Sequence, residues 1–120
     1  MAWNAQFFET RDGECPALDF LNGVHAKMQA RLAVLVEAVE QNGFGLGGGY
    51  FEACHGYSDL FEIRAKVSRS LGRIYCTLDG GILVLVSGLL KEEGEATPEA
   101  ALEQAAAYIR EYRETKRLRR

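Results

Sequence analysis

The sequence lacks the features that mark membrane, disulfide-bonded and zinc-binding proteins. Its 120 residues include only 3 cysteines, Cys15, Cys54 and Cys76, and none of them forms a CxxC pair. An odd number of cysteines without paired spacing favours reduced thiols over a disulfide framework or a zinc site. Apolar runs such as 82–86 are far too short to span a bilayer, and no basic-then-apolar leader follows Met1. We therefore expect a cytoplasmic protein with no membrane partner, no metal and no cofactor.

Neither sign of charge dominates the chain. The 14 Lys and Arg residues stand against 17 Asp and Glu residues, which gives a net charge of −3 and a pI near 5.4. Such a balance argues against indiscriminate nucleic-acid binding, because that affinity comes mainly from charge neutralisation. The charge is nevertheless uneven, with a net of −4 over residues 1–56 and +2 over residues 57–91. A local basic surface is therefore compatible with an acidic total.

Hydrophobic periodicity predicts one α+β domain over residues 1–120. With 48% hydrophobic and 26% charged residues, the composition is that of an ordinary globular domain. The predicted elements are a strand at 3–8, helices at 17–21 and 24–41, strands at 61–67, 73–78 and 82–90, and a helix from 100 to about 116. We expect a small antiparallel sheet, made of the N-terminal strand and a three-strand meander. It packs against two N-terminal helices and a C-terminal helix that Thr97 caps.

Two of the predicted strands carry a polar face with three cations. If the apolar residues of these strands face the helices, six residues share the opposite face: Glu62, Arg64, Lys66, Arg73, Tyr75 and Thr77. Antiparallel pairing would bring Arg64 and Arg73 together, where they are able to hold a phosphate while Tyr75 stacks on a base. The alternative interpretation is a solvated sheet face on which Glu62 pairs with its neighbours. Spacing alone leaves both open.

Other candidate residues give weaker indications of a functional site. His55 lies in the loop before these strands, where an imidazole is able to exchange protons near neutral pH, although a loop histidine is more often simply exposed. The glycine cluster at 43–49 lacks the lysine of a phosphate-binding loop. The six bases at 110–120 fit the C-terminal end of a helix, where the helix dipole favours cations, and they are also a candidate contact for a partner or RNA.

Several short motifs resemble the HigB-like branch of the RelE/ParE toxin superfamily, which is often described as phage-derived or phage-related. The residues that carry the resemblance are Tyr57-Ser-Asp-Leu-Phe-Glu-Ile-Arg64, Gly72-Arg-Ile-Tyr75, Asp79-Gly-Gly-Ile-Leu-Val-Leu-Val-Ser-Gly88, Lys91 and Thr97-Pro98. They follow the family's order of an Arg-ending strand, a strand that contains Arg and Tyr, a hydrophobic strand and a Thr-Pro helix start. Earlier segments at 15–21 and 46–51 fit the same layout, so the resemblance extends over nearly the whole chain.

The resemblance implies the toxin of a toxin-antitoxin system. Such proteins are metal-independent endoribonucleases, or mRNA interferases, which cut mRNA on the ribosome and are neutralised by a helix-turn-helix antitoxin. Carried over by position, Arg64 and Arg73 would hold phosphate, and Lys91 corresponds to the first lysine after the last strand. Tyr75 would stack on or orient a base, and Glu62 would act as a base or a structural partner, with His55 as a further candidate acid or base.

The chain also departs from the family pattern. Ser87 and Leu89 stand where the family often has histidine and phenylalanine, and Glu92, Glu93 and Glu95 replace a lysine-rich segment. Acidic residues beside an RNA surface repel phosphate. The alternative interpretation is therefore a non-catalytic interaction module of phage or plasmid origin that keeps the fold with a degraded active site. A third is a small-molecule binding protein with no role in RNA.

Overall fold

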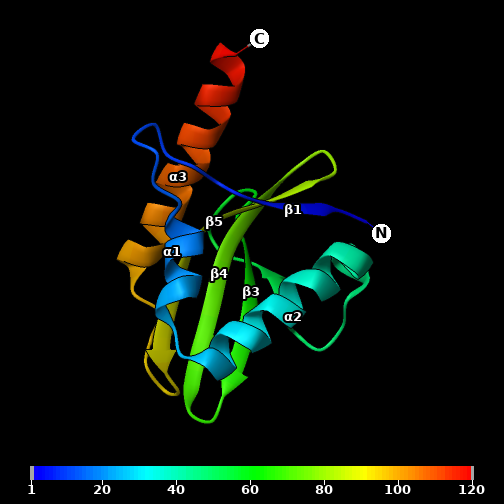
Figure 1. Ribbon diagram of the computed structural model, residues 1–120, viewed down its shortest axis with the longest axis vertical. Helices are drawn as coiled ribbons and strands as arrows, with labels where there is room; N and C mark the ends of the chain where they lie inside the picture. The colour runs from blue at the N-terminus through cyan, green and yellow to red at the C-terminus, as the bar shows by residue number, and fades with distance from the viewer. Residues whose placement is uncertain (1, 120) are drawn as a thin grey trace.

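The structure, a computed structural model, describes residues 2–119 (Figure 1). The elements in chain order are β1 (Asn4–Phe7), α1 (Pro16–Gly23), α2 (Ala26–Asn42), a short 3-10 helix η1 (Gly43–Gly45), β2 (Phe51–Ala53), β3 (Phe61–Val67), β4 (Ser70–Asp79), β5 (Ile82–Glu92) and α3 (Glu99–Leu118). The α+β class and the predicted order of elements are confirmed. Within the described residues, no helix is both long enough and apolar enough to cross a lipid bilayer.

The predicted sheet of antiparallel strands is wrong in two respects: one pair of strands is parallel, and the sheet has one more strand than predicted. Its strand order is β1-β5-β4-β3-β2, and β1 runs parallel to β5 while the other neighbours are antiparallel. The chain leaves β1, passes through both N-terminal helices and re-enters the sheet at the far edge, so β1 meets only the last strand of the meander. The edge strand β2 was not predicted, because three residues are too few to show an alternating pattern.

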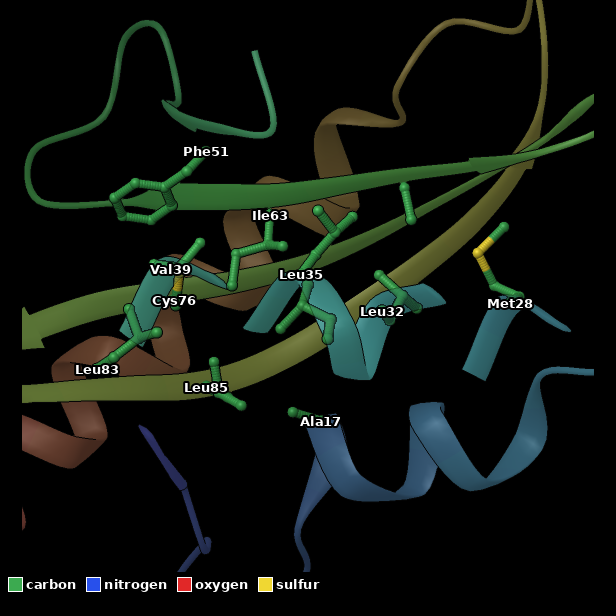
Figure 2. Packing of buried hydrophobic residues seen from close by; sticks show 12 residues of the cluster. Ala17, Met28, Leu32, Leu35, Val39, Phe51, Ile63, Cys76, Leu83 and Leu85 are labelled. Carbon is green, nitrogen blue, oxygen red and sulfur yellow. The ribbon is translucent and has the colours of Figure 1, made fainter. Parts of the chain in front are cut away.

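One face of the sheet packs against α1 and α2. Figure 2 shows the α2 side chains directed at the strands, with Ala17 of α1 beside Leu85 of β5. The buried members of this first core are Ala17, Met28, Leu32, Leu35, Val39, Phe51, Ile63, Ala65, Ile74, Cys76, Leu83 and Leu85. This confirms the predicted inward face of β3 and β4. It also accounts for the amphipathic pattern of α2, whose buried residues recur every three or four positions.

The opposite face is partly covered by α3, so helices lie on both sides of the sheet. A second core contains Phe8, Cys54, Leu60, Tyr75, Val84, Val86, Ala105 and Ile109. The helix runs back along the meander from the end of β5 towards the β4–β5 hairpin, and its C-terminal turns extend past the sheet (Figure 1). The polar face predicted for β3 and β4 is therefore partly covered by α3.

The two long helices begin with different kinds of cap. His25 precedes α2 as its N-cap, and its ring Nδ1 accepts a hydrogen bond from the Met28 amide at 3.3 Å. Pro98 is the N-cap of α3, and no side chain caps that helix. The predicted cap, Thr97, is one residue too early because the helix begins at Glu99, and the Thr97 hydroxyl is engaged elsewhere, as described below.

Candidate functional site

Strand alternation and pairing bring four cations to one face of the sheet. In the register of β3 and β4, Arg64 lies opposite Arg73 and Lys66 lies opposite Leu71. On the other side of β4, Leu71 lies opposite Lys91. Residues directly opposite each other point to the same side of a sheet. We call Arg64, Lys66, Arg73 and Lys91 the cationic face, and the predicted approach of the two arginines is confirmed.

Glu62 occupies the centre of the arginine pair. Its Oε1 accepts a hydrogen bond from Arg64 Nε at 2.7 Å, and its Oε2 lies 3.2 Å from a terminal nitrogen of Arg73. Glu62 is only 4% exposed. A carboxylate removed from water in this way needs charged partners, and two guanidinium groups supply them. Glu62 is thus placed as the predicted structural partner of both arginines.

Thr97 is a site residue that the sequence analysis did not identify as functional. The same terminal nitrogen of Arg73 donates a hydrogen bond to Thr97 Oγ1 at 2.9 Å, across 24 positions of the sequence. Only 17% of the Arg73 side chain is exposed, compared with 42% for Arg64. Arg64 also lies 3.9 Å from a Glu52 carboxylate oxygen. The only sequence signal for Thr97 was its place before Pro98, which indicated a helix start.

The two lysines of the cationic face also contact acceptors from the chain itself. Lys66 forms an ion pair with Glu93, and Lys91 Nζ donates to the backbone carbonyl of Glu95 at 2.5 Å. Lys91 lies inside β5 rather than after it, because that strand continues to Glu92. Each cation of the face therefore has an oxygen acceptor from the protein.

Tyr75 does not have the position predicted for it. It is fully buried in the second core, where α3 covers it, so a base has no access to the ring in this structure. Burial, with Glu62 nearby, raises the pKa of Tyr75 to about 12, which keeps the phenol protonated. Its hydroxyl and that of its register partner Ser87 are buried, and neither has a hydrogen-bond partner among the described residues. The prediction failed because strand alternation does not say which face α3 covers.

His55 lies at the surface between β2 and β3, apart from the arginine network. Its side chain is exposed, and no hydrogen bond or ion pair connects it to the cationic face in the described part of the chain. The neighbouring Cys54 is buried instead, and burial together with the Glu62 carboxylate raises its pKa to about 12. A thiol with such a pKa is a poor nucleophile at neutral pH.

The arrangement is suited to binding an oxyanion rather than to holding a metal. Guanidinium and ammonium groups on one face are donors for phosphate oxygens. Across residues 2–119, no group of three or more His, Cys, Asp or Glu side chains is placed to hold a metal ion. A cavity of about 650 Å³ lies at the other end of the sheet, between β1 and the C-terminal half of α3, and it includes none of the four cations.

Comparison with known families gives one match. Residues 19–110 match the family described as "Phage derived protein Gp49-like (DUF891)". The matched segment extends from α1 into α3 and contains all four cations together with Glu62 and Thr97. No curated protein matches the sequence.

Proposed function

Because the chain belongs to the phage-derived Gp49-like family, a RelE-like toxin family, we propose that it is the toxin of a toxin-antitoxin pair and cuts mRNA on the ribosome in the manner of the HigB branch. The observation that carries this proposal is the arginine pair: Arg64 and Arg73 lie directly opposite each other, with Lys66 and Lys91 in the next row of the same face. Guanidinium and ammonium groups are the donors that phosphodiester oxygens bind.

The chemistry proposed for this face is transesterification of RNA. The ribose 2′-oxygen attacks the adjacent phosphorus, the bond from phosphorus to the 5′-oxygen breaks, and a proton moves from the 2′-oxygen to solvent while the leaving 5′-oxygen acquires one. Negative charge accumulates on the non-bridging oxygens, and Arg64 and Arg73 stabilise it because they are fixed donors. Glu62 is a positioning residue in this scheme, since both of its oxygens already accept from arginine.

The partner proposed with this activity is a helix-turn-helix antitoxin, as in other toxin-antitoxin pairs. An adjacent short reading frame that encodes such a protein would supply the reagent for a binding test. Antitoxin binding is expected to survive the change Arg73→Ala, whereas RNA cleavage is expected to be lost.

Two features favour the alternative of a non-catalytic interaction module. The resemblance to the HigB-like branch places Ser87 where that branch often has histidine, and Tyr75, which lies opposite Ser87 on β4, is buried. A serine hydroxyl does not ionise near neutral pH, so this face has fewer acid-base groups than a nuclease normally uses. In this alternative the fold and the antitoxin-binding surface remain while the cleavage is absent.

Growth arrest in a tightly repressed bacterial host separates the two functions. The wild-type chain is compared with Arg64→Ala/Arg73→Ala and with a control, Lys27→Ala/Arg110→Ala, that removes the same charge from exposed positions outside the face. The nuclease predicts arrest and transcripts cut within codons for the wild type and the control only. Undisturbed growth with soluble, folded wild-type protein would contradict the nuclease and support the interaction module.

A further inference from the structure

The last residue of β5 and most of the segment that links β5 to α3 lie against the cationic face. We call residues 92–97 the acidic loop, because Glu92, Glu93 and Glu95 fall within it. Its contacts with the face are the Glu93 ion pair to Lys66, the Glu95 carbonyl that accepts from Lys91, and the Thr97 hydroxyl that accepts from Arg73. Three of the four cations therefore have an acceptor from this one loop.

Hydrogen bonds hold the acidic loop in this position. The Glu93 amide donates to the carbonyl of Arg69 at 2.7 Å, which ties the loop to the β3–β4 turn. Within the loop, the Glu92 amide donates to Glu95 Oε1 at 2.6 Å, and the Glu95 amide donates to the Glu92 carbonyl at 3.1 Å. The loop thus presents its acceptors to the face in a fixed arrangement.

The acceptors of the loop are of the kind that RNA would supply. A carboxylate, a carbonyl and a hydroxyl oxygen occupy donors that would otherwise bind phosphate oxygens. The Lys66–Glu93 pair is solvent-exposed on both sides, with side-chain exposures of 58% and 48%. Exposed pairs of this type are individually weak, so a polyanion is able to displace them. The loop and an RNA backbone compete for the same donors.

We propose that the acidic loop is an intramolecular competitor that lowers the affinity of the cationic face for RNA, and that RNA must displace it to reach Lys66, Lys91 and Arg73. This inference rests on the proposed function, since RNA is the ligand with which the loop competes. It gives the loop a specific role in setting activity, where the sequence indicated only a general repulsion of phosphate by the glutamates.

Binding of a fluorescein-labelled, single-stranded 12-mer RNA by fluorescence anisotropy tests the inference. The variant Glu93→Gln/Glu95→Gln removes two negative charges from the loop with little change of shape. The matched control, Asp12→Asn/Glu37→Gln, removes two charges from exposed positions for which the described residues show no ion pair. Circular dichroism and thermal unfolding of each protein establish that all are folded.

We expect the loop variant to bind RNA about two- to fivefold more tightly than the control, as the loss of a weak exposed ion pair implies. Its salt dependence is also expected to be steeper, because more lysine charge is available to phosphate. Equal affinity of the loop variant and the control, with RNA bound by both, would overturn the competition and leave the proposed function intact. Absence of RNA binding by every protein, the loop variant included, would overturn the proposed function and the competition together.

Discussion

Arg64 and Arg73 lie directly opposite each other on β3 and β4, and one carboxylate, that of Glu62, contacts both guanidinium groups. Like charges at opposed positions of a sheet repel, so this pairing would be unfavourable by itself. Glu62 is almost completely buried and supplies the compensating charge. The three residues are therefore one electrostatic unit, in which the carboxylate makes the arginine pair possible.

The change Glu62→Gln is expected to destabilise the fold. It removes the buried carboxylate charge that contacts both arginines, and breaking a buried ion pair in this way costs about 3 kcal/mol. Urea denaturation followed by circular dichroism measures the free energy of unfolding. The matched control is Glu52→Gln, whose half-exposed carboxylate lies 3.9 Å from Arg64 and should contribute less than about 1 kcal/mol. Equal losses in the two variants would contradict the central position of Glu62.

The arginine pair was predictable from the sequence because it depends on local rules. The residues of β3 and β4 alternate with period two, and a short turn joins the strands, so the inward set Ile63 and Ile74 fixes the outward set Arg64 and Arg73. Neither step requires knowledge of the rest of the chain. The same alternation predicted the residues of β3 and β4 that pack against α2 in the first core.

The features that escaped prediction depend on where distant segments pack. The apolar stripe of α3 is compatible with either face of a sheet, so the burial of Tyr75 followed only from the three-dimensional arrangement. The bond from Arg73 to Thr97 depends on the path of the acidic loop, which carries no periodic signal. The parallel pairing of β1 likewise depends on the order in which the meander fills the sheet.

The change Gly88→Ala is expected to cost about 1–3 kcal/mol of folding stability. A Cβ at this position of β5 would lie 2.1 Å from a ring carbon of Phe20, which packs against the first core, and overpacking of this kind displaces side chains or backbone. Gly47→Ala is the control, because a Cβ there meets nothing within 4 Å. Thermal unfolding of the two variants measures the difference. Similar melting temperatures would show that Phe20 does not pack on Gly88.

The three cysteines are expected to differ in their reaction with iodoacetamide. Burial raises the pKa of Cys54 to about 12, so only about one thiol in ten thousand is ionised at pH 8. Cys76 is buried as well, and its pKa is also raised, whereas Cys15 is partly exposed before α1. Peptide mass spectrometry after labelling at pH 8 should find Cys15 modified first. Labelling in urea is the control, since unfolding should make the three rates similar, and fast labelling of Cys54 in the folded protein would contradict its burial.

The contact between the β4–β5 hairpin and the end of α3 is expected to make stability depend on pH. Lys116 and the Tyr112 hydroxyl both donate to the Asp79 carboxylate, and these hydrogen bonds lower the pKa of Asp79 in the folded state. A carboxyl group whose pKa is lowered by folding stabilises the fold above its unfolded pKa of about 3.9, and this contribution is lost as the pH falls through the lower folded pKa. Asp79→Asn should therefore be less stable than the wild type at pH 7, and the difference in the free energy of unfolding should narrow below about pH 4.

Urea denaturation at pH 7, 5 and 3 measures this difference in the free energy of unfolding, and Asp12→Asn controls for the loss of one exposed charge. A difference that stays constant down to pH 3 would show that the ionised carboxylate of Asp79 does not hold the end of α3 to the hairpin.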